Sequence, residues 1–156
     1  MVILPMETPK DLNDALAVYV ISVKDFKTRQ ASIEKQLCQL GLSFEYIWDY
    51  DPVPGFRDGL NTSDDLSDAS ASNVLKHMVA QKRLVDSDKS LALVIEDDVI
   101  FLPGVLESLR VSVLEMQKGD QGKLFFLGGR DNRLSDKRLQ CRTQALIPAP
   151  MTTAEL

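Results

Sequence analysis

The stretch LALVIEDDVIF, from Leu91 to Phe101, joins an apolar run to three consecutive acids. A continuous apolar run of this kind is typical of a strand that is covered on both faces, as in a parallel sheet. Open α/β sheets form their ligand crevice beyond the carboxyl ends of the strands, which is where Glu96, Asp97 and Asp98 would lie. The stretch therefore predicts an α/β fold and a candidate site at these three acids.

Apolar runs and helical stripes alternate along the rest of the chain. Before the acid-tipped strand we expect strands at 15–23 and 44–50 and helices at 28–40 and 72–85, and after it a helix from near Pro103 and a strand at 123–129. Gly41 is expected to end the first helix. Residues 51–68 are expected to form a long loop. The helix at 72–85 has an apolar stripe that consists of Val74, Leu75, Met78, Val79 and Leu84. This order predicts a doubly wound domain with a mainly parallel sheet, incomplete at the C-terminus.

The composition limits the class of protein. The 156 residues, 44% hydrophobic and 26% charged, predict one globular domain at 15–156 after a loose leader at 1–14. The net charge of -5 argues against a nucleic-acid binder. No run approaches the ~18 apolar residues of a membrane span, and the start lacks a signal-peptide pattern, so we expect a cytoplasmic location. Cys38 and Cys141 have neither zinc nor disulfide spacing, which predicts two reduced thiols.

The three acids permit more than one role. Mg²⁺ and Mn²⁺ prefer oxygen ligands and bridge readily to substrate phosphates. Alternatively, Asp97 or Asp98 caps the turn before the next helix while the other acids are solvated. Strand alternation predicts that Asp97 points to the opposite face from Glu96 and Asp98. A phosphoacceptor receiver domain is disfavoured, because its acid strand should come first and the available acceptor, Asp131, lies beyond the last strand.

Four segments, in order, resemble glycosyltransferase family 25, which includes lipooligosaccharide and collagen galactosyltransferases. VYVISVKDFKTRQASIEKQLCQLGLSFE resembles the family's opening strand, turn and helix and contains Arg29. LKH, Leu75–His77, resembles the Ser-His signature of the next helix, and its spacing to ALVIEDDV agrees. LFFLGG resembles the strand that follows. The resemblance covers residues 16 to 130 and depends on the ordered set.

The resemblance implies a Rossmann-like nucleotide-sugar-binding domain of the GT-A type. Glu96, Asp97 and Asp98 would stand in for the Asp-x-Asp motif, with Asp98 and Glu96 as ligands of Mn²⁺ or Mg²⁺ against a diphosphate. The implied donor contacts are Arg29, His77, Glu96, Asp97 and Gly128. The implied reaction moves galactose or glucose, with inversion, from a UDP-sugar to a lipooligosaccharide or lipopolysaccharide acceptor, and the catalytic residues are unknown. Peripheral membrane association and a homodimer through an open sheet edge are further expectations.

Several of these residues have ordinary alternatives. Arg29 pairs with a phosphate or with an acid of the cluster, or is an exposed arginine at a helix end. His77, which is the single histidine of the chain, is in most helices a packed or surface residue rather than a catalyst. Gly128 and Gly129 allow close backbone approach to a ligand or form a turn.

Three departures from the family pattern keep a second function open. Lys76 occupies the place of the family's Ser, and WDYDP, Trp48–Pro52, replaces an Ala-Val-Asp-Gly type of sequence. The chain also ends at MTTAEL, near where the acceptor-side half and its general base are expected. The alternative is a catalytically inactive nucleotide-sugar-binding or assembly module of the same fold, and a plain metal-binding α/β domain ranks third.

Overall fold

The computed structural model describes residues 11–60, 65–117, 125–126 and 147–148. Its elements, in order, are α1 Leu12–Ala15, β1 Leu16–Ile21, α2 Lys27–Gln39, β2 Glu45–Ile47, α3 Asp68–Asp86, β3 Leu91–Glu96, α4 Val105–Gln117, β4 Phe125–Phe126 and β5 Ile147–Pro148. The chain divides into two compact units. One of them, Pro9–Pro103, contains the elements from α1 to β3. This unit contains all three acids.

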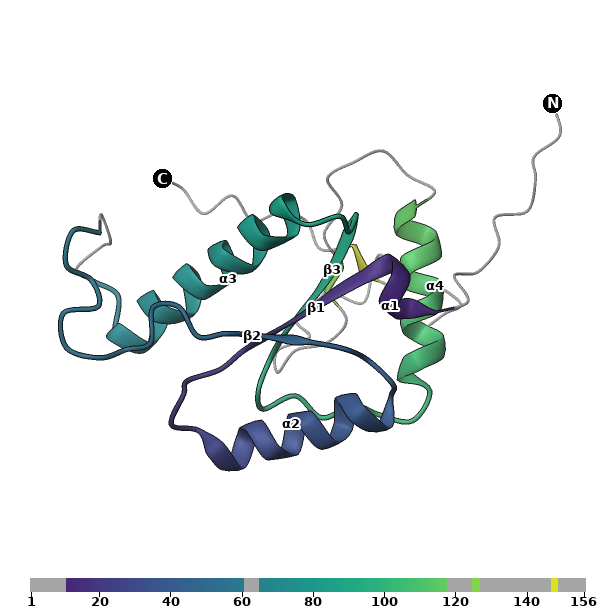
Figure 1. Ribbon diagram of the computed structural model, residues 1–156, viewed down its shortest axis with the longest axis horizontal. Coiled ribbons are helices and arrows are strands. Elements are labelled where there is room, and N and C mark those ends of the chain that lie inside the picture. Colours follow the sequence, from purple (N-terminus) through teal and green to yellow (C-terminus); the bar gives the residue numbers. More distant parts are fainter. Residues whose placement is uncertain (1–10, 61–64, 118–124, 127–146, 149–156) are drawn as a thin grey trace, which may run out of the picture. The chain divides into compact units, whose positions relative to one another are not determined.

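A three-stranded parallel sheet forms the centre of the Pro9–Pro103 unit. Its strand order is β2-β1-β3, and β1 pairs in parallel with both neighbours. The helices α2 and α3 lie on opposite faces of this sheet (Figure 1). Because both faces are covered, Val18, Tyr19 and Val20 of β1 are all buried. The expected mixed α/β fold with a parallel sheet is confirmed.

The strand order reverses direction at the carboxyl edge of β1. The chain passes from β1 to β2 on one side and then crosses back to β3 on the other side. Ile21 is in register with Glu96, so Ser22 and Asp97 follow at the same level of two adjacent strands. Such a reversal is the position at which open α/β sheets bind their ligands.

The end of α2 is held by α1. Gly41 adopts a φ of +67°, and the Leu42 N–H donates to the Leu37 carbonyl over 3.0 Å, which confirms Gly41 as the stop signal. Asn13 of α1 donates to the Gly41 carbonyl and accepts from the Ser43 N–H, both over 2.8 Å. The helix α1 spans the expected leader boundary at residue 14, and Leu12 within it is buried.

The face that α3 buries agrees only in part with the predicted apolar stripe, of which Val79 and Leu84 pack against the core. The helix begins at Asp68, four residues before expected, because the Ser67 hydroxyl accepts from the Ser70 N–H over 3.2 Å and caps it. Val74 and Met78 are 52% and 58% exposed. The buried positions are Ala71, Ser72, Lys76 and Ala80. The small side chains of Ala71, Ser72 and Ala80 let the helix lie close to the sheet. Lys76 binds polar groups at the edge of the sheet.

Two strands also depart from the sequence-based expectation. β2 ends at Ile47 rather than Tyr50, because Tyr50 turns the backbone with a φ of +55°. We expect β4 as a fourth strand of the parallel sheet, but it pairs antiparallel with β5 in a separate two-stranded sheet. Pro148 lacks an N–H and suits such an edge pairing. The expected short strand in the tail is confirmed as β5.

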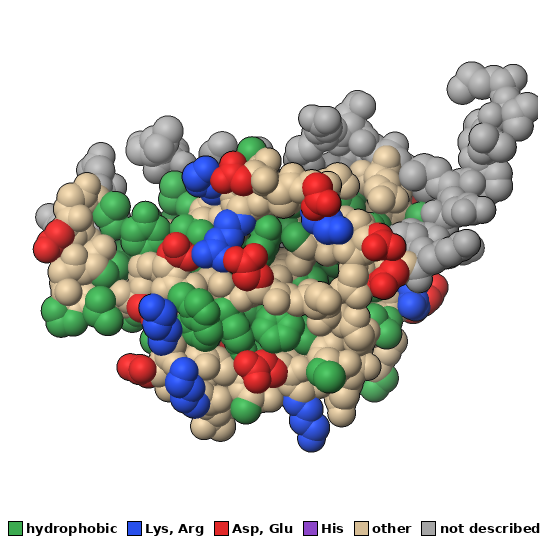
Figure 2. Space-filling view, in the orientation of Figure 1, with side chains coloured by type: hydrophobic (Ala, Val, Ile, Leu, Met, Phe, Trp, Pro, Cys, Tyr) green, Lys and Arg blue, Asp and Glu red, His purple; other side chains and the backbone are tan. Residues whose placement is uncertain are grey.

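The face of the molecule in Figure 2 carries interspersed acidic and basic side chains, and hydrophobic side chains gather over β2 and α2. Tyr46 stacks edge-on against Phe44 at 5.3 Å between ring centroids and lies 4.3 Å from the Trp48 ring. Its hydroxyl donates to the Glu34 carboxylate over 3.1 Å. This contact fastens β2 to α2. In the part of the chain that the structure describes, no helix has the length and apolar character needed to cross a membrane.

Candidate functional site

The three acids at the end of β3 have different environments. Asp97 is buried, with 5% of its side chain exposed, whereas 59% of the Asp98 side chain is exposed and Glu96 also faces solvent. The expected opposite orientation holds between Asp97 and Glu96, which is bound by Asn73 of α3. It does not hold between Asp97 and Asp98, because both carboxylates lie against Arg29 Nη1 in the turn after β3. Because α4 begins only at Val105, neither Asp97 nor Asp98 lies at the start of that helix. Both acids lie instead in the turn after β3, where the Val99 N–H donates to the Glu96 carbonyl over 3.3 Å, and the exposure of Glu96 and Asp98 agrees with the alternative of solvated acids.

Asp97 is held by residues from the end of β1 and from α2. The Ser22 hydroxyl donates to Asp97 Oδ2 over 2.6 Å, and Arg29 Nη1 donates to Asp97 Oδ1 over 3.4 Å. The Asp97 N–H donates to the Ile21 carbonyl over 3.1 Å, which continues the sheet by one residue. Both carboxylate oxygens of this acid are therefore engaged within the protein.

Arg29 connects the first turn of α2 to the acids. Its Nη1 lies 3.4 Å from Asp97 Oδ1 and 3.7 Å from Asp98 Oδ2, so the expected pairing with the acid cluster is confirmed. The guanidinium also lies over the Phe26 ring, at 4.9 Å from the centroid. The Arg29 side chain is 52% exposed. Since a guanidinium has five N–H donors, Arg29 retains donors for an anion from solvent.

An open hollow of ≈ 320 Å³ lies beside this arginine. Its lining consists of Asp25, Phe26, Lys27, Thr28 and Arg29. These residues form the turn after β1 and the start of α2, where the helix dipole and the first N–H groups favour negative charge. Lys27 and Arg29 add two cations to the lining, and Asp25 adds one carboxylate. The net positive charge favours an anion such as a phosphate group.

Glu96 and His77 lie on the α3 side of the acid turn. Glu96 Oε1 accepts from Asn73 Nδ2 over 3.1 Å. Burial lowers the pKa of His77 below its usual value of 6.5, and the nearby Glu96 carboxylate raises that pKa in part. Because burial is the larger effect, His77 is neutral near pH 7 and offers one donor and one acceptor nitrogen.

The acids fit a divalent cation only in part. Among residues 11–60, 65–117 and the two short strands, no three His, Cys, Asp or Glu side chains converge as a metal-binding group. Asp97 is engaged by Ser22 and Arg29, so Asp98 and Glu96 remain as carboxylates that face solvent. Mg²⁺ in phosphate sites is commonly bound by one or two carboxylates together with waters and substrate phosphates. Asp98, beside Arg29, fits that mode, whereas Glu96 accepts a hydrogen bond from Asn73 of α3, and the described residues form no cage built from the protein alone.

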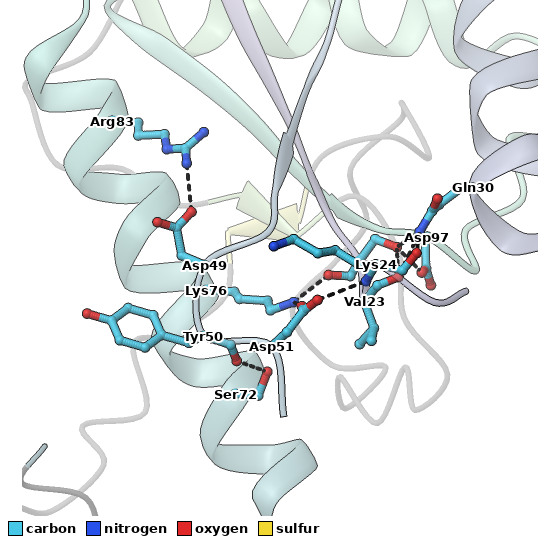
Figure 3. A network of polar contacts seen from close by, with 11 residues as sticks. Val23, Lys24, Gln30, Asp49, Tyr50, Asp51, Ser72, Lys76, Arg83 and Asp97 are labelled. Carbon is cyan, nitrogen blue, oxygen red and sulfur yellow. Dashed lines mark hydrogen bonds and ion pairs between the residues drawn. The ribbon is translucent and has the colours of Figure 1, made fainter. Parts of the chain in front are cut away.

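Sequence reasoning missed a buried lysine that lies next to this site. Only 2% of the Lys76 side chain is exposed, and its Nζ contacts both the Ser22 carbonyl and the Asp51 carboxylate (Figure 3). Lys76 and Asp51 belong to the two segments in which the chain departs from the family pattern. Lys76 lies one helical turn before the buried Ala80. A lysine at such a position needs an acidic partner, and this spacing would have indicated the ion pair.

The segment Asp49–Asp51, which we name the clamped corner, is fastened to α3 at each of its three residues. Arg83 Nη2 donates to Asp49 Oδ2 over 2.6 Å, and the Ser72 hydroxyl donates to the Tyr50 carbonyl over 2.6 Å. Lys76 pairs with Asp51 (Figure 3). A positive φ at a residue other than glycine costs free energy, and these three contacts hold Tyr50 in that conformation.

Two expected residues lie outside the described part of the chain, namely Gly128 and Gly129. Among the remaining expected residues, the structure brings Arg29 to Asp97 and Asp98, and His77 to Glu96. No family model matches the chain, and no curated protein is significantly similar to it. The resemblance to glycosyltransferase family 25 therefore depends on the order of the sequence motifs.

Proposed function

We propose that the chain binds a UDP-sugar and belongs to a glycosyltransferase that moves a hexose, galactose or glucose, to a saccharide of lipooligosaccharide or lipopolysaccharide. The fold proposed for it is the Rossmann-like GT-A type. The order of the sequence motifs supports this proposal, and so does the composition of the carboxyl edge. A saccharide acceptor on a glycolipid also implies a peripheral association with the membrane.

One observation carries the proposal. Arg29, from the helix after β1, lies against Asp97 and Asp98, from the turn after β3, at the point where the strand order reverses. This arrangement places a half-exposed guanidinium and an exposed carboxylate side by side at the edge where α/β sheets bind nucleotides. A diphosphate with a divalent cation needs both kinds of group, a cation for its oxygens and a carboxylate for the metal.

Each group then has a separate task. Arg29 and the hollow at residues 25–29 bind the diphosphate, while Asp97 fixes the direction of the guanidinium. Asp98 and Glu96 would hold Mn²⁺ or Mg²⁺, which supplies Lewis-acid stabilisation of the charge that develops on the leaving diphosphate. Neutral His77 hydrogen-bonds a hydroxyl of the donor from the α3 side. The described residues leave the general base of the transfer unassigned.

The test is a calorimetric titration of the 156-residue chain with UDP and with UDP-galactose, with and without Mn²⁺. Asp98→Ala is expected to abolish the metal-dependent part of the binding. Asp88→Ala is the matched control, because Asp88 is an exposed acid near the opposite end of β3. Absence of binding by the folded wild-type chain would overturn the proposal.

The complete engagement of Asp97 favours a second candidate, a catalytically inactive nucleotide-sugar-binding or assembly module of the same fold. In that case the chain retains the binding of UDP but turns over no donor. Hydrolysis of UDP-galactose, measured as released UDP, separates the two candidates. Release that disappears in Asp98→Ala supports the enzyme, and binding without release supports the inactive module.

A further inference from the structure

The ion pair between Lys76 and Asp51 is buried at the edge of the sheet that carries the acids. The side chains are 2% and 11% exposed, respectively. Asp51 also accepts from the Lys24 N–H over 2.9 Å, so both of its oxygens are engaged. The pair thus joins α3, the clamped corner and the turn after β1 through one ammonium group.

Stability alone does not explain such a pair. Two charges lose much of their hydration on burial, and replacing a buried ion pair by uncharged side chains of similar volume is often neutral or stabilising. Removal of one partner, in contrast, leaves a buried charge without compensation and destabilises the fold. The informative variant is therefore the one that removes both charges together.

The contacts of Lys76 extend to the acids through Ser22. The ammonium group holds the Ser22 carbonyl, while the Ser22 hydroxyl donates to Asp97 over 2.6 Å. Asp97 in turn orients Arg29. From the α2 side, Gln30 Nε2 donates to the Val23 carbonyl over 2.7 Å and to the Lys24 carbonyl over 3.2 Å. The turn at residues 22–24 is therefore fixed from both faces of the sheet (Figure 3).

We propose that Lys76 is a positioning residue, which fixes the end of β1 through Asp51 and Ser22 so that Asp97 directs Arg29 toward an anionic ligand. Lys76 itself does not contact the ligand, because its ammonium group is buried. The identity of that ligand, a nucleoside diphosphate, rests on the function proposed above. The positioning of Arg29 does not depend on it.

The experiment compares Lys76→Met/Asp51→Asn with the wild-type chain. The introduced asparagine keeps an acceptor for the Lys24 N–H, so the double variant removes the two charges with little change of volume. The matched control is Lys82→Met/Asp86→Asn, which removes an exposed pair, 2.7 Å apart, from the same helix. Urea denaturation gives the free energy of unfolding of each protein, and we expect both double variants to remain near the wild-type value.

Two readouts then separate positioning from a merely structural role. The first is the Nε–H signal of Arg29 in ¹⁵N NMR spectra, assigned by its loss in Arg29→Lys. In Lys76→Met/Asp51→Asn we expect this signal to move toward that of a free surface arginine and to lose its heteronuclear NOE. The second readout is the affinity for UDP with Mn²⁺, which we expect to fall about ten- to a hundredfold, as for residues that orient a ligand-binding group.

The outcomes remain distinct. A folded double variant with an unchanged Arg29 signal and unchanged UDP affinity overturns the positioning role and leaves the proposed function standing. If the wild-type chain binds no UDP, the proposed function fails, and the Arg29 signal alone still decides the positioning role. Movement of the Arg29 signal in the Lys82→Met/Asp86→Asn control would also overturn it, because the effect would not be specific to the buried pair.

Discussion

The Ser22 hydroxyl donates a hydrogen bond over 2.6 Å to the buried carboxylate of Asp97, across 75 positions of sequence. This contact joins the carboxyl ends of two adjacent parallel strands, β1 and β3, just beyond their last paired residues. Asp97, the middle acid of the cluster, therefore has a structural role within the sheet. Asp98, in contrast, is 59% exposed.

Ser22→Ala tests how much this contact stabilises the fold. The substitution leaves the buried Asp97 carboxylate without its shortest hydrogen bond, and bonds to charged groups contribute about 1.5–3 kcal/mol. We expect the free energy of unfolding, measured by urea denaturation, to fall by about that amount. Ser32→Ala, at an exposed position of α2, serves as the control and should change it by less than about 0.5 kcal/mol. Equal effects of the two substitutions would contradict the assignment.

Local signals in the sequence were sufficient for the centre of the sheet. The apolar runs predicted β1 and β3, because a strand that is covered on both faces needs apolar residues at successive positions. Gly41 predicted the end of α2, where it has a positive φ. Strand alternation predicted the different environments of Glu96, which is exposed, and Asp97, which is buried, but it failed for Asp98, which lies beyond the end of β3. Each of these features depends on residues that are close together in the chain.

Features that depend on distant partners were missed. The apolar stripe predicted the buried face of α3 only in part, since Val79 and Leu84 pack against the core. It missed Lys76, which is buried because Asp51 and the Ser22 carbonyl bind its ammonium group. The early end of β2 was also missed, because it depends on the hydrogen bond from the Ser72 hydroxyl of α3 to the Tyr50 carbonyl. The partner of β4 was also missed, because an isolated pair of phenylalanines does not indicate which strand it joins.

Metal and nucleotide should stabilise the chain only together. Asp98 and Glu96 offer a cation two carboxylates at most, so the diphosphate has to complete the coordination. We expect Mn²⁺ alone or its removal by EDTA to leave the Tm unchanged, and Mn²⁺ with UDP to raise it. At UDP concentrations about 100 times Kd the gain is about 2.7 kcal/mol, or several degrees in differential scanning fluorimetry. A rise with Mn²⁺ alone would instead indicate a metal site complete within the protein.

Gly41→Ala should destabilise the chain through the backbone. Gly41 has a φ of +67°, and a methyl group there would meet no heavy atom within 4 Å, so sterics with neighbours do not add to the effect. The left-handed conformation costs an alanine about 1–2 kcal/mol. Thermal and urea denaturation should show that loss, while Gly41→Asn should lose less, because asparagine tolerates this conformation better. If alanine and asparagine behave alike, the backbone conformation at this position is not the cause.

His77 should make the chain less stable as the solution becomes acidic. Burial lowers the pKa of His77 in the folded protein below the value of 6.5 that it has when exposed. Below about pH 6.5 the unfolded chain therefore binds more protons than the folded chain, and the free energy of unfolding decreases with falling pH until the folded pKa is passed. His77→Gln removes this titration, so we expect the stability of the wild type relative to His77→Gln to fall between about pH 7 and about pH 5. If it instead increases over that range, the attraction of Glu96 outweighs burial, and His77 is a cation rather than a neutral hydrogen-bonding group in the folded chain.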